Sequence, residues 1–340
     1  ERHNTVGLPI MQYLWFDTDT QEVNINREKY DEIERRLYFD DDEQVSGKIE
    51  PAKLAEYYRQ SDEYALMFKW FNREALELLG TSALIQGAKQ IRPLGRLAFF
   101  HSYATLRKKL EQKIRIISAN AQLVASQMGY TSIGGSVSSP PLAPNPPAPP
   151  LPYRGGAGGE VGATVASPPS IDNPVEIVIV TSLAGGTGSG SFIDMAFLAR
   201  EIALNAMITG LLFLPHVFEG NAAIAQEVIK ANGYAALKEL DYYLTPYTTP
   251  RRETGSPNGK NRAYPSLNFE VEWDGKPHRI PRPPFTTAYL IDNKNHLGMH
   301  TEDATDVFQM AAEFLMLDFD SSPFAATKRG VRLNMEQFLH

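Results

Sequence analysis

A short apolar run, a glycine-rich loop and a helical pattern follow one another in residues 175–202, VEIVIVTSLAGGTGSGSFIDMAFLAREI. Residues 175–180 are apolar and rich in β-branched side chains, which is typical of a strand buried on both faces. Apolar residues then recur at helical spacing after Ser191, which we predict to be the N-cap, with Asp194 at the capping-box position. A buried strand that leads through a glycine loop into a helix predicts a parallel α/β fold.

The loop AGGTGSG, residues 184–190, has the composition of a phosphate-binding loop. Glycine lets backbone N–H groups approach an anion closely, and a helix N-terminus favours negative charge. The loop lacks the Gly-Lys-Ser/Thr ending of a Walker A motif, and Ser191 replaces the last glycine of the dinucleotide fingerprint. The alternative is a glycine-rich turn without a ligand, but four glycines interleaved with Thr and Ser exceed what a turn requires. We therefore predict phosphate binding by backbone N–H groups, with hydrogen bonds added by the Thr187 and Ser189 hydroxyls.

The composition excludes several classes of protein. A chain of 340 residues that is 43% hydrophobic and 21% charged can bury a large core. The net charge of −7 argues against wholesale nucleic-acid binding, which usually shows a basic excess. There is no cysteine, which excludes a disulfide framework and fits a reducing cytoplasm, and the apolar runs are too short to span a bilayer. We expect a cytoplasmic protein with no nucleic-acid partner and no membrane span.

Strand and helix patterns alternate along the rest of the chain, and polar loops follow the strand ends. This alternation predicts a Rossmann-like parallel sheet flanked by helices. Asp274-Gly275 between two strand-like runs predicts a hairpin. The expected strands are residues 10–16, 175–180, 209–213 and 285–291, and the hairpin covers 266–280. The expected helical segments are 51–79, 222–244 and 301–319, together with a helix that includes residues 106–117.

Residues 129–173 form a low-complexity segment rich in proline and glycine, including SSPPLAPNPPAPPLPYRGGAGG. Such a composition cannot build a core, so we expect an extended or disordered insert. We place it inside one domain, because the strand that completes the first half of the sheet arrives only at Val175. Its PxxP spacing offers a site for a proline-binding protein partner.

Several loops resemble those of the tubulin/FtsZ superfamily, in the same order along the chain. AGGTGSG resembles the signature loop GGGTGSG of tubulin and GGGTGTG of FtsZ. WFDTDTQ resembles the FtsZ string VNTDAQ, and GAKQIRPLGRLA resembles the FtsZ loop GAGGNPEIGRKA that cups the terminal phosphate. LPHVFEG resembles KPFxFEG, IDNKN resembles IPNDKL, and DVFQMAAEFL resembles DAFxxADNVL of the central helix. The chain thus resembles the nucleotide-binding domain of a bacterial tubulin-like protein.

The resemblance implies GTP or GDP as ligand, together with Mg²⁺. Because the signature loop has no basic residue, the phosphate charge is offset by the helix dipole, by Mg²⁺, or by Arg92 and Arg96, which are otherwise surface charges. Ala223 stands where FtsZ has the arginine that follows its ribose-binding glutamate. Ala312 stands where the central helix of FtsZ has the polar residue that contacts the base. The implied phosphate contacts are Ala184, Gly185, Gly186, Thr187, Gly188, Ser189, Gly190, Ala88, Lys89 and Gln90; the implied ribose and base contacts are Glu219, Asn293, Phe308 and Asp17.

In this family an acidic loop from the next subunit of a filament completes hydrolysis. GVRLNMEQFL resembles that loop weakly. Asn334 and Glu336 match two of its polar positions and are the catalytic candidates acting in trans, whereas Leu339 stands where the family has a second acidic residue. The resemblance also implies a first strand with its own glycine loop before Glu1 and a second domain after the central helix. The chain then divides into 1–128, the first part of the nucleotide-binding domain; 129–173, the insert; 174–320, the second part with the central helix; and 321–340, the start of a following segment.

Three functions are compatible with these residues. The leading hypothesis is a GTP-binding protein that assembles with itself head to tail into filaments, with GTP hydrolysis at the subunit contacts. The alternative is a non-hydrolysing nucleotide-binding scaffold or sensor of a larger bacterial complex, docked through the proline-rich insert. The third is a doubly wound enzyme that prefers ATP or a dinucleotide to GTP.

Overall fold

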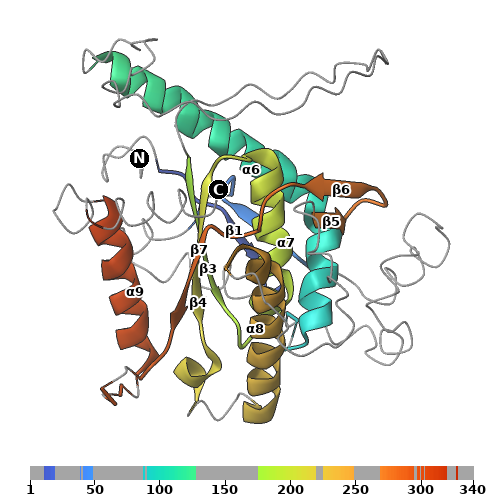
Figure 1. Cartoon of the computed structure of the whole chain (residues 1–340), viewed down its shortest axis with the longest axis vertical. Coiled ribbons are helices and arrows are strands. Elements are labelled where there is room, and N and C mark those ends of the chain that lie inside the picture. The colour runs from blue at the N-terminus through green and yellow to red at the C-terminus, as the bar shows by residue number, and fades with distance from the viewer. Residues whose placement is uncertain are drawn as a thin grey trace, which may run out of the picture.

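The computed structural model describes residues 11–19, 39, 41–48, 87–88, 90–127, 175–219, 225–248, 269–294, 297–298, 300–301, 303–319 and 327. A parallel three-stranded sheet lies at the centre of this part (Figure 1), with the strand order β3-β4-β7. Its strands are β3 (Glu176–Ser182), β4 (Met207–Phe213) and β7 (Thr287–Ile291). Parallel strands end at the same edge of a sheet, so the loops that follow them lie close together. The prediction of a parallel α/β fold is confirmed.

Helices cover both faces of this sheet (Figure 1). On one side, α7 (Thr187–Ile202) buries Phe192 and Phe197 completely or nearly so, and α6 (Arg92–Gln127) packs against it. The same side carries α8 (Gln226–Thr248). On the other side, α9 (Ala304–Phe319) places Phe314 against Tyr289 of β7, with ring centroids 5.0 Å apart. The sheet is therefore the middle layer of three.

Two smaller strand pairs complete the described structure. β1 (Trp15–Asp17) pairs in parallel with β2 (Gln44–Ser46), and β5 (Phe269–Glu272) pairs in antiparallel with β6 (Pro277–Ile280). The second pair is the hairpin predicted around Asp274-Gly275. In the described residues, β1 and β3 belong to separate sheets, whereas the sequence pattern favoured one continuous sheet. Residues of both strands line a cavity that lies between them.

The helices α6 and α7 cross with their backbones in contact. A Cβ atom on Gly95 would lie 2.1 Å from the carbonyl oxygen of Gly186, and one on Gly190 would lie 2.2 Å from that of Arg92. Side chains at these two positions would force the helices apart. One of the glycines that the sequence suggested for ligand binding, Gly190, is therefore also needed for helix packing.

The helix after the glycine loop begins earlier than predicted. Its N-cap is Gly186 and its first residue is Thr187, so the prediction of Ser191 as N-cap is wrong. The Ser191 hydroxyl instead donates a hydrogen bond to the carbonyl oxygen of Thr187, 2.7 Å away, within the helix. Contact with α6 stabilises a first turn that contains two glycines and that local propensity alone disfavours.

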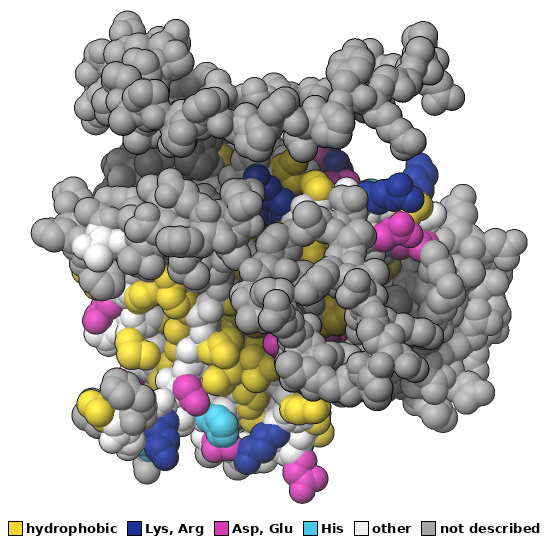
Figure 2. Space-filling view, in the orientation of Figure 1, with side chains coloured by type: hydrophobic (Ala, Val, Ile, Leu, Met, Phe, Trp, Pro, Cys, Tyr) yellow, Lys and Arg dark blue, Asp and Glu magenta, His cyan; other side chains and the backbone are white. Residues whose placement is uncertain are grey.

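Other boundaries differ in smaller ways. The first strand covers Trp15–Asp17 rather than 10–16, α6 extends to Gln127, and α8 begins at Gln226 rather than 222. The predicted helix 51–79 and the insert 129–173 lie outside the described residues. None of the described helices is long and apolar enough to span a bilayer. Figure 2 shows hydrophobic side chains gathered on the lower part of one face, where Figure 1 places α9 and the ends of the central strands.

Candidate functional site

A hollow of about 620 Å³ lies beyond the end of β3. The glycine loop forms one wall with residues 185–188, and the end of β1 forms another with Asp17, Thr18 and Asp19. Gly87 and Ala88, which precede α6, complete this part of the lining. The volume falls within the range of small-molecule sites in proteins, about 300–1,000 Å³. The hollow is therefore a candidate ligand site.

The N-terminus of α7 opens at this hollow. The first intrahelical bond joins the Gly190 N–H to the Gly186 carbonyl oxygen at 3.1 Å, so the N–H groups before it have no partner within the helix. Just upstream, the Ala184 N–H already donates to the Ser182 Oγ at 3.0 Å. The helix dipole adds partial positive charge at the same place. These groups suit an anion.

The glycines of the loop have different tasks. A Cβ atom on Gly186 would lie 2.7 Å from the Ala88 Cβ, and one on Gly188 would lie 2.2 Å from the Thr181 Oγ1. A Cβ atom on Gly185 would meet nothing within 4 Å. Gly186 and Gly188 are thus required by neighbouring protein atoms, whereas Gly185 is open to the hollow.

A chain of hydrogen bonds joins the three loops around the hollow. The Ala88 N–H donates to the Thr18 Oγ1 at 2.8 Å, and the Thr187 Oγ1 donates to the Asp17 Oδ1 at 2.9 Å. The Thr18 and Thr187 Oγ1 atoms are 2.6 Å apart. The Thr18 hydroxyl also lies 3.5 Å from the Asp17 Oδ1, so the two threonine hydroxyls and this carboxylate form one cluster in which either hydroxyl can donate to the other. Buried bonds in series reinforce one another and hold the loops in fixed positions.

The two hydroxyls expected to bind phosphate already donate within the protein. The hydrogen of Thr187 goes to Asp17, and Ser189 donates to the Gly185 carbonyl oxygen. Ser189 is also fully buried, and neither it nor Gly190 is among the residues that line the hollow. In this structure the N–H groups of the loop, rather than its hydroxyls, are the donors that face the hollow.

Neither arginine considered for phosphate binding lines the hollow. Arg92 donates through Nη2 to the carbonyl oxygen of Ser189 at 2.8 Å and pairs with Glu239 of α8 at 2.6 Å. Arg96 pairs with Asp194 at 2.9 Å, and Asp194 also accepts the Trp273 Nε1–H at 3.1 Å. Burial alone would lower the pKa of Arg96, but Asp194 outweighs it and raises that pKa. Both arginines tie α6 to neighbouring helices.

The candidate ribose and base contacts lie around the ends of β4 and β7. The Asn293 Nδ2 donates to the carbonyl oxygen of His216 at 2.9 Å, which joins the loop after β7 to η4 (Pro215–Phe218). The Phe308 ring of α9 packs against Phe213 with centroids 5.2 Å apart, and 43% of the residue stays exposed. Glu219 follows η4, and a hydrogen bond from Lys230 lowers the pKa of its carboxyl. An aromatic face, an amide and an ionised carboxylate thus follow the carboxyl ends of these strands.

A family model described as tubulin-like matches residues 2–339. The chain belongs to this tubulin-like family. Comparison with curated proteins and with solved structures gave no match. The loops that resemble the superfamily in sequence are those that line the hollow or follow β4 and β7.

In this tubulin-like chain, Asp17 lies with the glycine loop rather than with the candidate base contacts. Its Oδ1 accepts the Thr187 hydroxyl and also the N–H groups of Thr18 and Asp19, at 2.6 and 3.2 Å. Lys89, Asn334 and Glu336 lie outside the described residues, so their roles stay predictions. Gln90 has a positive φ of 64° and does not line the hollow.

Two residues of the site went unnoticed in the sequence. Thr18 stands between two aspartates at the end of a predicted strand, where its position could have suggested a role. Asn232 lies in the middle of α8, and nothing in the local pattern distinguishes it. Its side chain reaches two loops that are distant in sequence.

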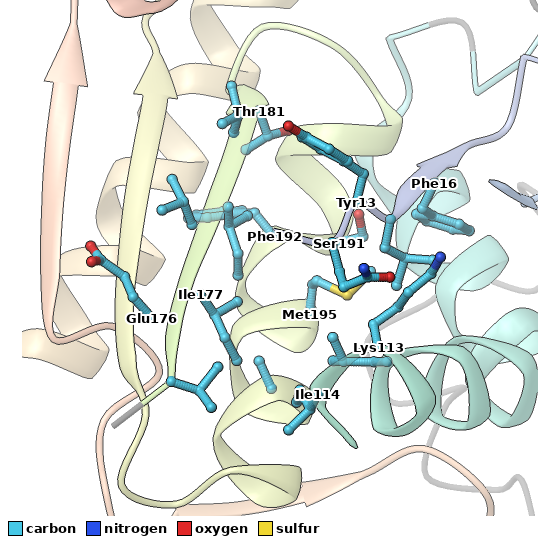
Figure 3. Close-up of a pocket in the computed structure, with 18 of the residues that line it drawn as sticks. Tyr13, Phe16, Lys113, Ile114, Glu176, Ile177, Thr181, Ser191, Phe192 and Met195 are labelled. Carbon is cyan, nitrogen blue, oxygen red and sulfur yellow. The ribbon is translucent and has the colours of Figure 1, made fainter. Parts of the chain in front are cut away.

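A second cavity of about 220 Å³ lies between β1 and β3 (Figure 3). Its labelled lining is mostly apolar, with Ile114 of α6 and Phe192 and Met195 of α7 pointing inward, while the Glu176 carboxylate points away. The Lys113 ammonium on its wall is paired with Asp42 at 2.6 Å. This tubulin-like chain therefore offers a mostly apolar space here, separate from the hollow beside the glycine loop, whose lining includes two carboxylates.

Proposed function

We propose that this tubulin-like chain binds GTP or GDP in the hollow beside the glycine loop. The observation that carries the proposal is Gly185, whose missing side chain leaves open space beside the N–H groups of α7. Backbone N–H groups at a helix N-terminus, approached across a glycine, are suited to phosphate. The loop of Gly87 and Ala88 faces the same hollow and is proposed to contact the far end of the phosphate chain.

The proposal includes Mg²⁺ bound with the nucleotide. The described lining of the hollow contains two carboxylates, Asp17 and Asp19, and no lysine or arginine. A polyphosphate beside two carboxylates requires a cation, and Mg²⁺ is commonly bound by one or two carboxylates together with substrate phosphates. No cluster of three metal-binding side chains occurs in the described part of the chain, so phosphate oxygens would have to complete the coordination. The ion would neutralise the charge of the phosphates.

The nucleoside is proposed to extend from the hollow toward the ends of β4 and β7. The exposed face of Phe308 offers a surface on which a base can stack. Asn293 offers its amide oxygen as an acceptor for the base edge, because its Nδ2 is engaged with His216 and His300. Glu219 is an acceptor for the ribose hydroxyls, because its lowered pKa keeps the carboxylate ionised.

We further propose that the chain assembles with itself head to tail, as the tubulin-like family suggests. A heterologous contact of this kind gives filaments when the rotation between subunits does not close a ring. Asn334 and Glu336 are the proposed groups that would complete GTP hydrolysis on the neighbouring subunit.

A non-hydrolysing nucleotide-binding scaffold is the second candidate. The observation that favours it is Ala312, which is exposed on α9 and presents no polar atom to a base. In this form the insert 129–173 is the proposed contact for a protein partner.

A calorimetric titration with Mg-GTP and Mg-ATP tests nucleotide binding. We expect GTP to bind more tightly than ATP, and the Gly185→Ala variant to lose about tenfold or more in affinity while keeping its melting temperature, because its methyl group enters the ligand space. Gly186→Ala is the contrasting variant and should lose stability as well, because its Cβ meets Ala88. A wild-type chain that binds neither nucleotide would refute the proposal, as would full affinity in Gly185→Ala.

Sedimentation and light scattering with GTP, GDP and no nucleotide test assembly, and phosphate release tests hydrolysis. Filaments that form with GTP, together with phosphate release that is slower in the Glu336→Gln variant, would support the self-assembling GTPase. Nucleotide binding without assembly or phosphate release at high protein concentration would favour the scaffold.

A further inference from the structure

Asn232 of α8 bridges two loops that border the candidate phosphate site. Its Nδ2 donates to the carbonyl oxygen of Gln90 at 2.7 Å and to that of Ala184 at 2.9 Å. A carboxamide nitrogen carries two hydrogens, so both are used in these two bonds. Asn232 is buried and does not line the hollow, so it reaches a ligand there only through the loops.

Both acceptor carbonyls, those of Gln90 and Ala184, belong to the two loops that border the hollow. Ala184 immediately precedes Gly185, the residue that opens onto the hollow. Gln90 follows Ala88 by two residues and has φ 64°, a left-handed conformation that is costly for a residue with a side chain. The Ile91 N–H also bonds to the Ala88 carbonyl oxygen at 2.7 Å, which makes a tight turn around Gln90. The Asn232 bond thus holds a strained turn against the end of β3.

The helix that carries Asn232 is itself fixed. A Cβ atom on the next residue, Gly233, would lie 2.3 Å from the Pro215 Cγ, so α8 packs closely on η4. Ile229 and Ala236, on the buried side of α8, are fully buried. A side chain on a packed helix keeps its hydrogen-bonding atoms in place better than one on a loop.

We infer that Asn232 is a positioning residue, which sets the separation between the loop of residues 87–91 and the glycine loop. The inference rests on the proposed function, in which a phosphate chain contacts both loops and therefore requires a fixed distance between them. A longer phosphate chain depends more on this distance than a shorter one. Loss of the two bonds should therefore weaken GTP more than GDP.

The variant Asn232→Asp tests the inference with little change in volume. The carboxylate has no hydrogen to donate and faces two carbonyl oxygens, so both bonds are lost. Asn232→Ala is the second variant and avoids the added charge. Tyr234→Ala is the matched control, because Tyr234 lies two residues further along α8 and is 68% exposed.

Hydrogen exchange of the nucleotide-free protein measures the positioning itself. We expect the amides of Ala88, Ile91 and Ala184 to exchange about tenfold faster in both Asn232 variants, and unchanged rates in Tyr234→Ala. Because this measurement needs no ligand, it stays informative whatever the nucleotide titration gives. Unchanged loop exchange in a folded Asn232→Asp variant would overturn the inference.

Titration with GTP and GDP then measures how much the positioning of the two loops contributes to nucleotide affinity. In Asn232→Ala, which adds no charge that would itself repel GTP more than GDP, we expect the affinity for GTP to fall about tenfold, and the ratio of the GDP to the GTP dissociation constant to shrink. A merely structural role would lower the melting temperature and leave that ratio unchanged, which would overturn the inference. If the wild type binds neither nucleotide while loop exchange still rises in the variants, the proposed function fails and the link between the loops stands.

Discussion

The hydroxyls of Thr18 and Thr187 are 2.6 Å apart, although 169 positions separate these residues in the sequence. Thr18 directly follows β1, and Thr187 is the first residue of α7. Their bond continues to Ala88 on one side and to Asp17 on the other. Three loops that come from distant parts of the chain are therefore held together by the protein's own hydrogen bonds.

Thr187→Val should destabilise the protein by about 1–3 kcal/mol, because the buried Thr18 hydroxyl loses its partner on Thr187 and Asp17 loses a donor. The two side chains have nearly the same shape, so the change removes mainly the hydrogen bonds. Chemical denaturation measures the loss. Thr305→Val in the first turn of α9 is the control: Thr305 is exposed and its hydroxyl bonds the exposed Asp303 carboxylate, so the cost should stay below about 1 kcal/mol. Equal costs for the two variants would contradict the importance of this chain of bonds.

Gly190→Ala should destabilise the protein although alanine is the better helix former. Helix propensity favours alanine by about 1 kcal/mol. The added Cβ, however, would lie 2.2 Å from the Arg92 carbonyl oxygen, and overpacking costs about 1–3 kcal/mol or more. We expect a net loss of stability in thermal unfolding. Gly185→Ala, where the Cβ meets nothing within 4 Å, is the control and should leave the melting temperature unchanged.

Asp194→Asn should cost about 1–3 kcal/mol, because it removes the buried counter-charge of the Arg96 guanidinium, whose own side chain is 35% exposed and stays partly hydrated. The asparagine oxygen can still accept the Trp273 Nε1–H, so the loss reports mainly on the ion pair. Glu239→Gln breaks the Arg92 pair on the exposed side of α8 and should cost less than about 1 kcal/mol. Denaturant titration of both variants checks the ranking, and a reversed order would refute this account of Asp194.

Stability should fall as pH rises through the pKa of His278. Burial alone would lower the pKa of His278, but its hydrogen bonds to Asp274 and Glu201, at 3.0 and 2.8 Å, outweigh burial and raise that pKa. A raised folded-state pKa adds stability that is fully present below the unfolded value of about 6.5 and is lost as pH rises through the folded value. The β5–β6 hairpin would then be anchored to α7 more firmly at mildly acidic pH.

Denaturation of wild type and His278→Gln across this pH range isolates the effect. The difference in unfolding free energy between the two proteins should be of the order of 1 kcal/mol larger below pH 6 than above pH 8. A constant difference between wild type and His278→Gln would rule out this contribution of His278.

Part of the architecture could be predicted from local patterns. The strand–glycine loop–helix order and the Asp274-Gly275 hairpin were predicted correctly, because apolar periodicity and turn residues act over a few positions. The loop strings also led to the tubulin-like family. Local rules were wrong about the start of α7, where a serine followed by an acid suggested an N-cap at Ser191.

Only tertiary packing distinguishes the roles of the individual residues in the glycine loop. In the sequence its glycines look equivalent, yet Gly186 is closed off by Ala88 and Gly190 by Arg92, while Gly185 alone of these three faces open space. The hydroxyls of Thr187 and Ser189 look equally available in the sequence, and both donate within the protein instead.

The sequence by itself therefore determined the order of elements, the family and the loops that surround the hollow, because each is encoded in residues close together along the chain. Tertiary structure decided which atoms face the hollow, which arginine pairs with which carboxylate, and that Asn232 joins two loops. These features depend on contacts between segments about 50 to 170 residues apart. Hydrogen bonding and close packing at such separations leave no periodic pattern in the sequence.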